Sequence, residues 1–108
     1  MAIKRVWHGW TTPENADAYE KLLHDTVFPG IEEKQIPGYR QIELWRHEHA
    51  NEVEFVTVMT FDSIHNVIDF QGNDYERAYV PAAARNVLKH WDKTSTHYET
   101  LETRNYNA

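Results

Sequence analysis

The most informative segment of the chain is Val53-Glu54-Phe55-Val56-Thr57-Val58-Met59-Thr60-Phe61, which is apolar on both sides of an extended backbone. Successive side chains of a strand point to opposite faces, so Phe55, Met59 and Phe61 share one face. Val56 and Val58 dominate the other face. A β-branched run of this kind, without Gly or Pro, is typical of a strand in the centre of a sheet. We therefore expect both of its faces to be covered.

The composition indicates one globular domain without affinity for polyanions. The 108 residues are 41% hydrophobic and 13% aromatic, which is enough for one core but not for two. Lys and Arg number 11 against 17 Asp and Glu, and a net charge of −6 provides no positive surface for nucleic acid or anionic lipid. We expect no secretion signal and no membrane span, and the absence of cysteine fits a cytoplasmic location.

Three further segments are predicted to be strands. Ile3–Trp10 comes first, and because neither of its faces is plainly polar, it too is expected near the centre of the sheet. Tyr39–His49 is more polar, as an edge strand would be, and residues 50–52 close a hairpin between it and the central run. Lys93–Leu101 has alternating Thr and Tyr residues and is predicted to be the last strand.

Two helical regions lie between these strands. The first begins with Thr12 as N-cap and Pro13 at the first helical position, and Pro29–Gly30 is expected to end or kink it. The second begins at residues 62–63, is interrupted at residues 72–74, and is expected to continue to Leu88. Pro81 predicts a kink or a new first turn within that continuation.

The order β-α-β-β-α-β predicts an α+β, ferredoxin-like fold, with a four-stranded antiparallel sheet and both helices on one face. Residues 1–102 form this domain, and residues 103–108 form a polar tail. Nothing in the chain remains to cover the other face, although Val6, Val56 and Val58 are expected there. Exposing several large apolar side chains is unfavourable by roughly 1.5–3 kcal/mol each. We therefore predict a homodimer that packs sheet to sheet.

Several segments resemble one known group of proteins. They are Val6-Trp7-His8-Gly9-Trp10-Thr11-Thr12-Pro13-Glu14-Asn15, Pro37-Gly38-Tyr39-Arg40, Glu54-Phe55-Val56-Thr57 and Phe61-Asp62-Ser63. They are similar to the antibiotic-biosynthesis-monooxygenase-like branch of the dimeric α+β barrel superfamily, over nearly the whole chain. The resemblance implies a pocket between sheet and helices, and relatives that oxygenate quinol-like or phenolic substrates without metal or flavin. It favours a cofactor-independent monooxygenase, with a non-catalytic ligand-binding or stress-response dimer as the alternative.

Haem binding or degradation is a third function that the resemblance brings into view. Relatives in the superfamily that degrade haem use an Asn on the first strand, and a Trp and a His on the second helix. The matching positions here hold Trp7, Phe70 and Val80, so the haem-ligating histidine is missing. His65 or His90 would serve only with a different haem pose, and we rank this function below the other two.

Cofactor-free oxygenation needs a base, a holder for the resulting anion and a dry pocket. His97 and His8 are the candidate bases, because histidine titrates near neutral pH and because the first and last strands of this fold are neighbours. The two histidines would meet if register and faces agree, and the alternative is a hydrogen-bonded role in the sheet or dimer interface. Arg40 is the candidate anion holder, with a structural salt bridge as the alternative.

Aromatic side chains are the candidates for binding an aromatic substrate, although a small domain also needs them to fill its core. Tyr75 and Tyr79 are placed in the pocket because the predicted helix sets them one turn apart. His47-Glu48-His49 has metal-chelating spacing but no third ligand, so we expect a solvated turn and no metal. The candidate substrate-binding residues are Trp7, Tyr39, Phe70, Tyr75 and Tyr79.

Overall fold

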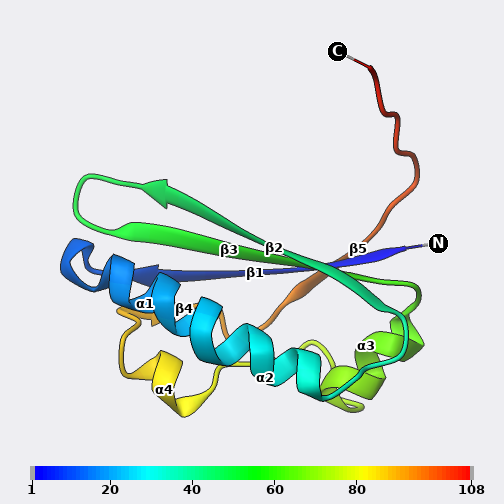
Figure 1. Ribbon diagram of the computed structural model, residues 1–108, viewed down its shortest axis with the longest axis horizontal. Coiled ribbons are helices and arrows are strands. Elements are labelled where there is room, and N and C mark those ends of the chain that lie inside the picture. The colour runs from blue at the N-terminus through cyan, green and yellow to red at the C-terminus, as the bar shows by residue number, and fades with distance from the viewer. Residues whose placement is uncertain (1, 108) are drawn as a thin grey trace.

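The computed structural model describes residues 2–107, and its centre is an antiparallel sheet with the strand order β2-β3-β1-β4 (Figure 1). The strands are β1 (Ile3–Thr11), β2 (Tyr39–Glu48), β3 (Val53–Phe61), β4 (His90–Trp91) and β5 (Thr96–Glu99). Both β4 and β5 pair with β1, along the edge opposite to β3. The predicted α+β, ferredoxin-like fold is confirmed, with its last strand divided in two.

The strand β3 lies between β1 and β2, as its two apolar faces predicted. Trp7 pairs with Thr57 and Val6 with Val58, so alternate residues of the two strands face the same side. On the inner side, Phe55 and Phe61 are fully buried against the helices. The inner face of β3 is therefore the floor of the hydrophobic core.

The helices α1 (Ala16–Leu22), α2 (Phe28–Glu33), α3 (Ile64–Gln71) and α4 (Ala82–Arg85) all lie on one side of the sheet (Figure 1). A 3-10 turn at Pro13–Asn15 precedes α1, and the Thr12 hydroxyl accepts a hydrogen bond from the Asn15 N–H. The predicted N-cap is confirmed. No helix among residues 2–107 is long and apolar enough to cross a membrane.

The first helix continues past Pro29, so of the two expectations for Pro29–Gly30, an end or a kink, the end is wrong. A π turn, η2 (Leu23–Val27), joins α1 to α2, and the Phe28 N–H donates to the Leu23 carbonyl five residues earlier. Pro29 then falls in the first turn of α2, where its missing N–H is tolerated. The wider hydrogen-bonding pattern thus carries the helix past the proline to Glu33.

The predicted helix from Asp74 to Leu88 is wrong for residues 74–80, which form an irregular segment. Their backbone groups have partners elsewhere: the Ala78 N–H donates to the Lys93 carbonyl at 2.9 Å, and the Ser95 N–H donates to the Glu76 carbonyl at 2.7 Å. These tertiary hydrogen bonds replace the helical ones. Pro81 begins a new helix, as predicted, because α4 starts at the next residue.

The predicted last strand Lys93–Leu101 is also only partly correct. The structure pairs β1 with residues 90–91 and 96–99, and residues 92–95 leave the sheet between them. Arg77 and Thr94 form an isolated antiparallel bridge, so this part of the chain pairs with the irregular segment instead. The excursion opens space beside the inner face of β1.

The face of the sheet away from the helices has no cover among the described residues. Val6, Val56 and Val58 lie there, and Val58 is enclosed by its neighbours at 6% exposure. Trp45 and Tyr98 lie on the same face and are 52% and 56% exposed. We call this surface, formed by the outward residues of β1, β2, β3 and β5, the open face.

Candidate ligand-binding cavity

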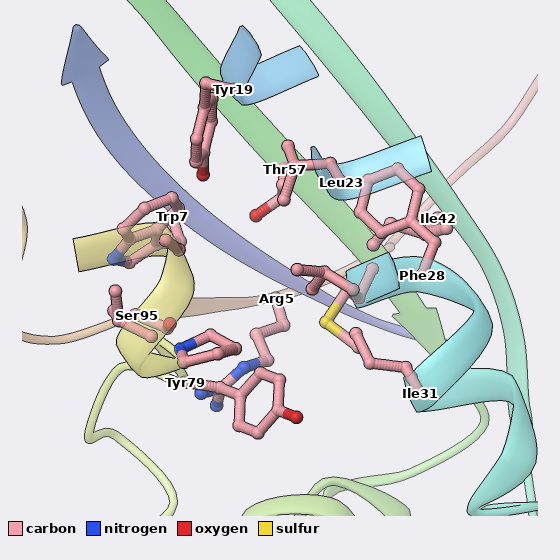
Figure 2. Close-up of a pocket in the computed structure, with 15 residues that line it drawn as sticks. Arg5, Trp7, Tyr19, Leu23, Phe28, Ile31, Ile42, Thr57, Tyr79 and Ser95 are labelled. Atoms are coloured by element: carbon pink, nitrogen blue, oxygen red, sulfur yellow. The ribbon is translucent and has the colours of Figure 1, made fainter. Parts of the chain in front are cut away.

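A cavity lies between the inner face of the sheet and the helices. Its volume is about 40 Å³. Its walls are mostly apolar, and polar groups reach it from β1, α1, β3 and the excursion between β4 and β5 (Figure 2). The lining residues are Arg5, Trp7, Tyr19, Leu23, Val27, Phe28, Ile31, Ile42, Thr57, Met59, Tyr79, Val80, Pro81, Ala84 and Ser95.

Arg5 supplies the charge in this cavity. Its side chain points inward from β1 and is 2% exposed. The guanidinium donates from Nη1 to the Tyr75 carbonyl at 2.5 Å and from Nη2 to the Arg77 carbonyl at 2.9 Å, and Nη1 lies 2.9 Å from His97 Nε2. Burial lowers the pKa of Arg5 to about 10, so the group stays positively charged at neutral pH.

His97 accepts a hydrogen bond from this guanidinium. Burial, and to a lesser extent the charge of Arg5, lowers the pKa of His97 to about 4. The imidazole is therefore neutral at pH 7, and its Nε2 lone pair is directed at Arg5. His97 is not among the residues that line the cavity, and its ring lies against Tyr75 at a centroid distance of 5.2 Å.

Hydroxyl groups reach the cavity from the other elements. Figure 2 shows the Tyr19 and Thr57 hydroxyls directed into the space, and Ser95 on the side of Trp7. Burial raises the pKa of the Tyr19 phenol, which therefore stays protonated. No hydrogen bond among the described residues engages this hydroxyl, and it is not one of the fully enclosed polar atoms without a partner. It is thus free to donate to a ligand.

Two of the predicted substrate-binding residues, Trp7 and Tyr79, line the cavity. The Trp7 indole donates to the Asp92 carbonyl at 2.7 Å, which fixes the ring as a wall. Gly9 makes room for it, because a Cβ at that position would collide with the Trp7 ring. The Tyr79 ring is held between Phe70, at a centroid distance of 5.2 Å, and the Lys34 ammonium, at 4.6 Å.

The other three predicted aromatic residues do not line the cavity. Phe70 is buried core beneath Arg5, Tyr39 packs on Phe61, and Tyr75 packs on His97. The helical spacing used to group Tyr75 with Tyr79 is absent, because residues 74–80 are irregular. Aromatic character alone therefore did not separate cavity walls from core.

His8 lies on the open face, so the structure does not bring it together with His97. His8 Nδ1 is 2.7 Å from Glu54 Oε2, and His49 Nε2 is 2.8 Å from the other oxygen of that carboxylate. Hydrogen bonds from His49 and His8 hold the pKa of Glu54 below its usual value. In the pairing of β1 with β5, the residue opposite His97 is Arg5 and not His8. A histidine pair is thus excluded by the faces of the two residues.

Arg40 also lies outside the cavity. Its guanidinium forms a two-pronged ion pair with Asp62, with Nη2 to Oδ2 at 2.6 Å and Nε to Oδ1 at 3.0 Å, and both side chains are exposed. This is the structural salt bridge that the sequence offered as the alternative. The residue that sequence reasoning missed is Arg5, whose signal was a charged side chain sharing a strand face with Trp7.

The histidines weighed for metal and haem lie at the surface. Within residues 2–107 no group of three His, Asp or Glu side chains is arranged to hold a metal ion. His65 and His90 are exposed and do not line the cavity, and His90 Nε2 is 3.0 Å from Glu52 Oε1.

The neutral state of His97 predicts a loss of stability in mild acid. In the unfolded chain the group titrates near 6.5, whereas in the folded protein its pKa is about 4. Between these values the unfolded state binds more protons, so the free energy of unfolding falls as the pH is lowered from 6.5 to 4. Substitution His97→Gln keeps an acceptor for Arg5 and removes the titration.

Urea denaturation at pH 7 and pH 5 measures this effect. The wild-type protein is expected to lose more stability between the two pH values than His97→Gln, because the carboxylates titrate equally in both proteins. His65→Gln, at an exposed position on α3, is the control and should behave like the wild type. Equal losses in wild type and His97→Gln would show that His97 is not held neutral.

Two solved structures share this fold. Rv0793 from Mycobacterium tuberculosis superposes with a TM-score of 0.62 at 15% identity, over 97% of this chain and 100% of that chain. A "putative antibiotic biosynthesis monooxygenase" from Chloroflexus aurantiacus J-10-fl superposes with a TM-score of 0.56 at 14% identity, over 99% of this chain and 98% of that chain. No protein-family model and no curated protein sequence matches the chain. The resemblance inferred from the sequence is thus confirmed at the level of the fold.

Proposed function

We propose that this chain is a small-molecule enzyme, a cofactor-independent monooxygenase of a phenolic or quinol-type aromatic substrate. The observation that carries the proposal is the cavity itself, an apolar space between sheet and helices with a buried cation and inward hydroxyls. The fold shared with a protein named as a monooxygenase supports it. Oxygenation without a cofactor requires a dry site in which an electron-rich phenolate is held while oxygen reacts.

The chemical roles within this proposal belong to two groups of residues. Arg5, Tyr19 and Thr57 present donors to the cavity and would stabilise a developing oxyanion. The roles predicted for His97 and His8 as bases, and for Arg40 as anion holder, stay predictions, and none of the three lines the cavity. A base role for His97 would require the proton to reach it through bound water, because the charged guanidinium of Arg5 has no acceptor atom.

Oxygen consumption in the presence of quinols and hydroxylated aromatic compounds tests the proposal. We expect uptake with at least one compound of the panel, and we expect Ala84→Leu to reduce it at least about tenfold by filling the cavity, because Ala84 is a buried wall residue. Ala18→Leu, on the exposed side of α1, is the matched control and should retain activity.

The same assay distinguishes the site assignments from the enzymatic proposal. Uptake that survives both His97→Ala and His8→Ala would remove the two histidines as bases and leave an enzyme. An absence of uptake across the panel, or uptake that Ala84→Leu does not reduce, would refute oxygenation in this cavity.

A non-catalytic ligand-binding dimer is the second candidate. The small size of the cavity favours this function. A volume of about 40 Å³ holds about three water molecules and admits an aromatic ring only after side chains move. Ligand binding without oxygen consumption, in the presence of dissolved oxygen, would identify this function.

The chain is further proposed to act as a cytoplasmic homodimer that packs through the open face. The exposed Trp45 and Tyr98 lie beside Val6 and Val56 on this face, and the described helices all lie on the other side. A second copy would cover these side chains in a self-complementary interface. The polar groups on the same face, including Lys4 and Glu54, would then lie within or around that interface.

A further inference from the structure

Within residues 2–107, Arg5 is a buried positive charge without an acidic partner. Its hydrogen-bond partners are two backbone carbonyls and the neutral ring of His97, and the Phe70 ring lies 5.5 Å from its Cζ atom. By contrast, Arg40 and Arg46 form ion pairs, each with a carboxylate oxygen within 3.2 Å. Buried arginine is normally paired with an anion, because desolvation of an unpaired charge is strongly unfavourable.

Part of the guanidinium remains available at the cavity wall. Of its five N–H groups, the three partners above use both of Nη1 and one of Nη2. The Nε–H and the second Nη2–H are left over. Thr11 Oγ1 is the only fully enclosed side-chain polar atom without a partner in the described part of the chain, so Arg5 Nε is not sealed within protein. These N–H groups can together hold two oxygens of one anion.

We propose that the cavity binds the oxyanion end of its ligand, a carboxylate or a phenolate, on the unused N–H groups of Arg5. The remainder of the ligand lies among the apolar walls formed by Leu23, Ile31 and Met59. The Tyr19 hydroxyl, which has no hydrogen-bond partner among residues 2–107, donates a further hydrogen bond to the ligand. This inference deepens the proposed function by naming the charge of the ligand. It rests on the proposed function only for the identity of the ligand as an oxygenase substrate, because anion binding itself does not require oxygen.

The surrounding residues position Arg5 for this task. The carbonyls of Tyr75 and Arg77 belong to the irregular segment, and they point at the guanidinium because that segment is not helical. His97 is a neutral acceptor and therefore leaves the positive charge of Arg5 uncompensated. A carboxylate in place of His97 would neutralise Arg5 and compete with the ligand. We accordingly treat His97 as a positioning residue in this site.

Binding of matched pairs of charged and neutral probes tests the inference. Benzoate is compared with benzamide, and acetate with acetamide, by isothermal titration calorimetry at pH 7.5, where Arg5 is charged and His97 is neutral. We expect each anion to bind about tenfold or more tightly than its amide, since hydrogen bonds between two charged groups are stronger than those to a neutral group. A phenolate is tested with 4-nitrophenol, whose absorbance reports its ionisation, and the bound form should remain ionised at lower pH than the free form.

Variants assign the effect to Arg5. Arg5→Met should abolish the preference for the anion, whereas Arg5→Lys should keep part of it. Arg104→Met removes the same charge from the exposed tail and is the control that should bind as the wild type does. Tyr19→Phe should weaken anion binding several-fold and leave the fold intact, because no described residue forms a hydrogen bond with the lost hydroxyl. Should Arg5→Met fail to fold, the probe pairs on the wild-type protein still decide the question.

The outcomes separate this inference from the proposed function. Equal binding of anion and amide, or an anion preference that survives in Arg5→Met, would overturn it. Oxygen uptake with quinols and no anion preference would overturn the inference and leave the proposed function. An anion preference without oxygen uptake would support the inference and refute the oxygenase. Binding of acetate but not benzoate would support the anion site and contradict an aromatic substrate.

Discussion

Trp45→Glu is expected to convert the proposed homodimer into a monomer. Trp45 is 52% exposed at the centre of β2 on the open face, and a buried aromatic anchor of a protein interface commonly contributes about 2 kcal/mol or more. A two-fold interface contains the residue twice, so the loss is doubled and the dimer is weakened about a thousandfold. The added carboxylate also lies beside Glu43, which faces the same side.

Light scattering coupled to size-exclusion chromatography measures this result at micromolar concentration. The wild-type mass should equal two chains and the Trp45→Glu mass should equal one chain. Leu101→Glu, at a position that is 79% exposed beyond β5, is the control and should stay dimeric. A wild-type mass of one chain would refute the interface, and an unchanged mass for Trp45→Glu would place it elsewhere.

Phe55→Ala is expected to lower the free energy of unfolding by about 3–5 kcal/mol. Phe55 is fully buried on the inner face of β3, and its ring meets the Tyr19 ring edge to face at a centroid distance of 4.9 Å. The substitution leaves a cavity beneath α1 that the rigid sheet cannot close. Because Tyr19 also lines the ligand cavity, its hydroxyl should lose its fixed position as well.

Guanidinium denaturation at one fixed protein concentration measures this loss, because the stability of a dimer depends on concentration. Leu101→Ala removes an exposed apolar side chain and should change stability by less than about 0.5 kcal/mol. A loss of under about 1 kcal/mol in Phe55→Ala would mean that the inner face of β3 is not the core.

The sequence predicted those parts of the fold that depend on local patterns of residues. The alternation in Val53–Phe61 identified the central strand, and Thr12 with Pro13 marked the start of the first helix. Residues 74–80 were misassigned because their partners are distant in sequence. Two of their carbonyls accept hydrogen bonds from the guanidinium of Arg5. The Ala78 N–H donates to the Lys93 carbonyl, and the Glu76 carbonyl accepts from the Ser95 N–H. Helical periodicity contains no information about such contacts.

The candidate site was predictable only in part, for a related reason. Trp7 and Tyr79 line the cavity as expected, but Phe70 and Tyr75 are equally aromatic and pack elsewhere. His97 was singled out for its chemistry, whereas the structure makes it an acceptor for Arg5. The role of His97 depends on the face of β5 to which its side chain points. The register of β5 on β1 sets that face, and the sequence does not reveal this register.

The π turn at Leu23–Val27 accounts for the straightness of one cavity wall. Tyr19, Leu23, Val27 and Ile31 recur every fourth residue, and all four contact the cavity. In a regular α-helix a step of four residues overshoots a full rotation by about 40°, so three steps would carry the last side chain about 120° around the axis. The π turn has more residues per rotation than an α-helix and therefore reduces this overshoot. The helix thereby keeps these four side chains on the side that faces the cavity, and a ligand bound there would meet one continuous row of side chains.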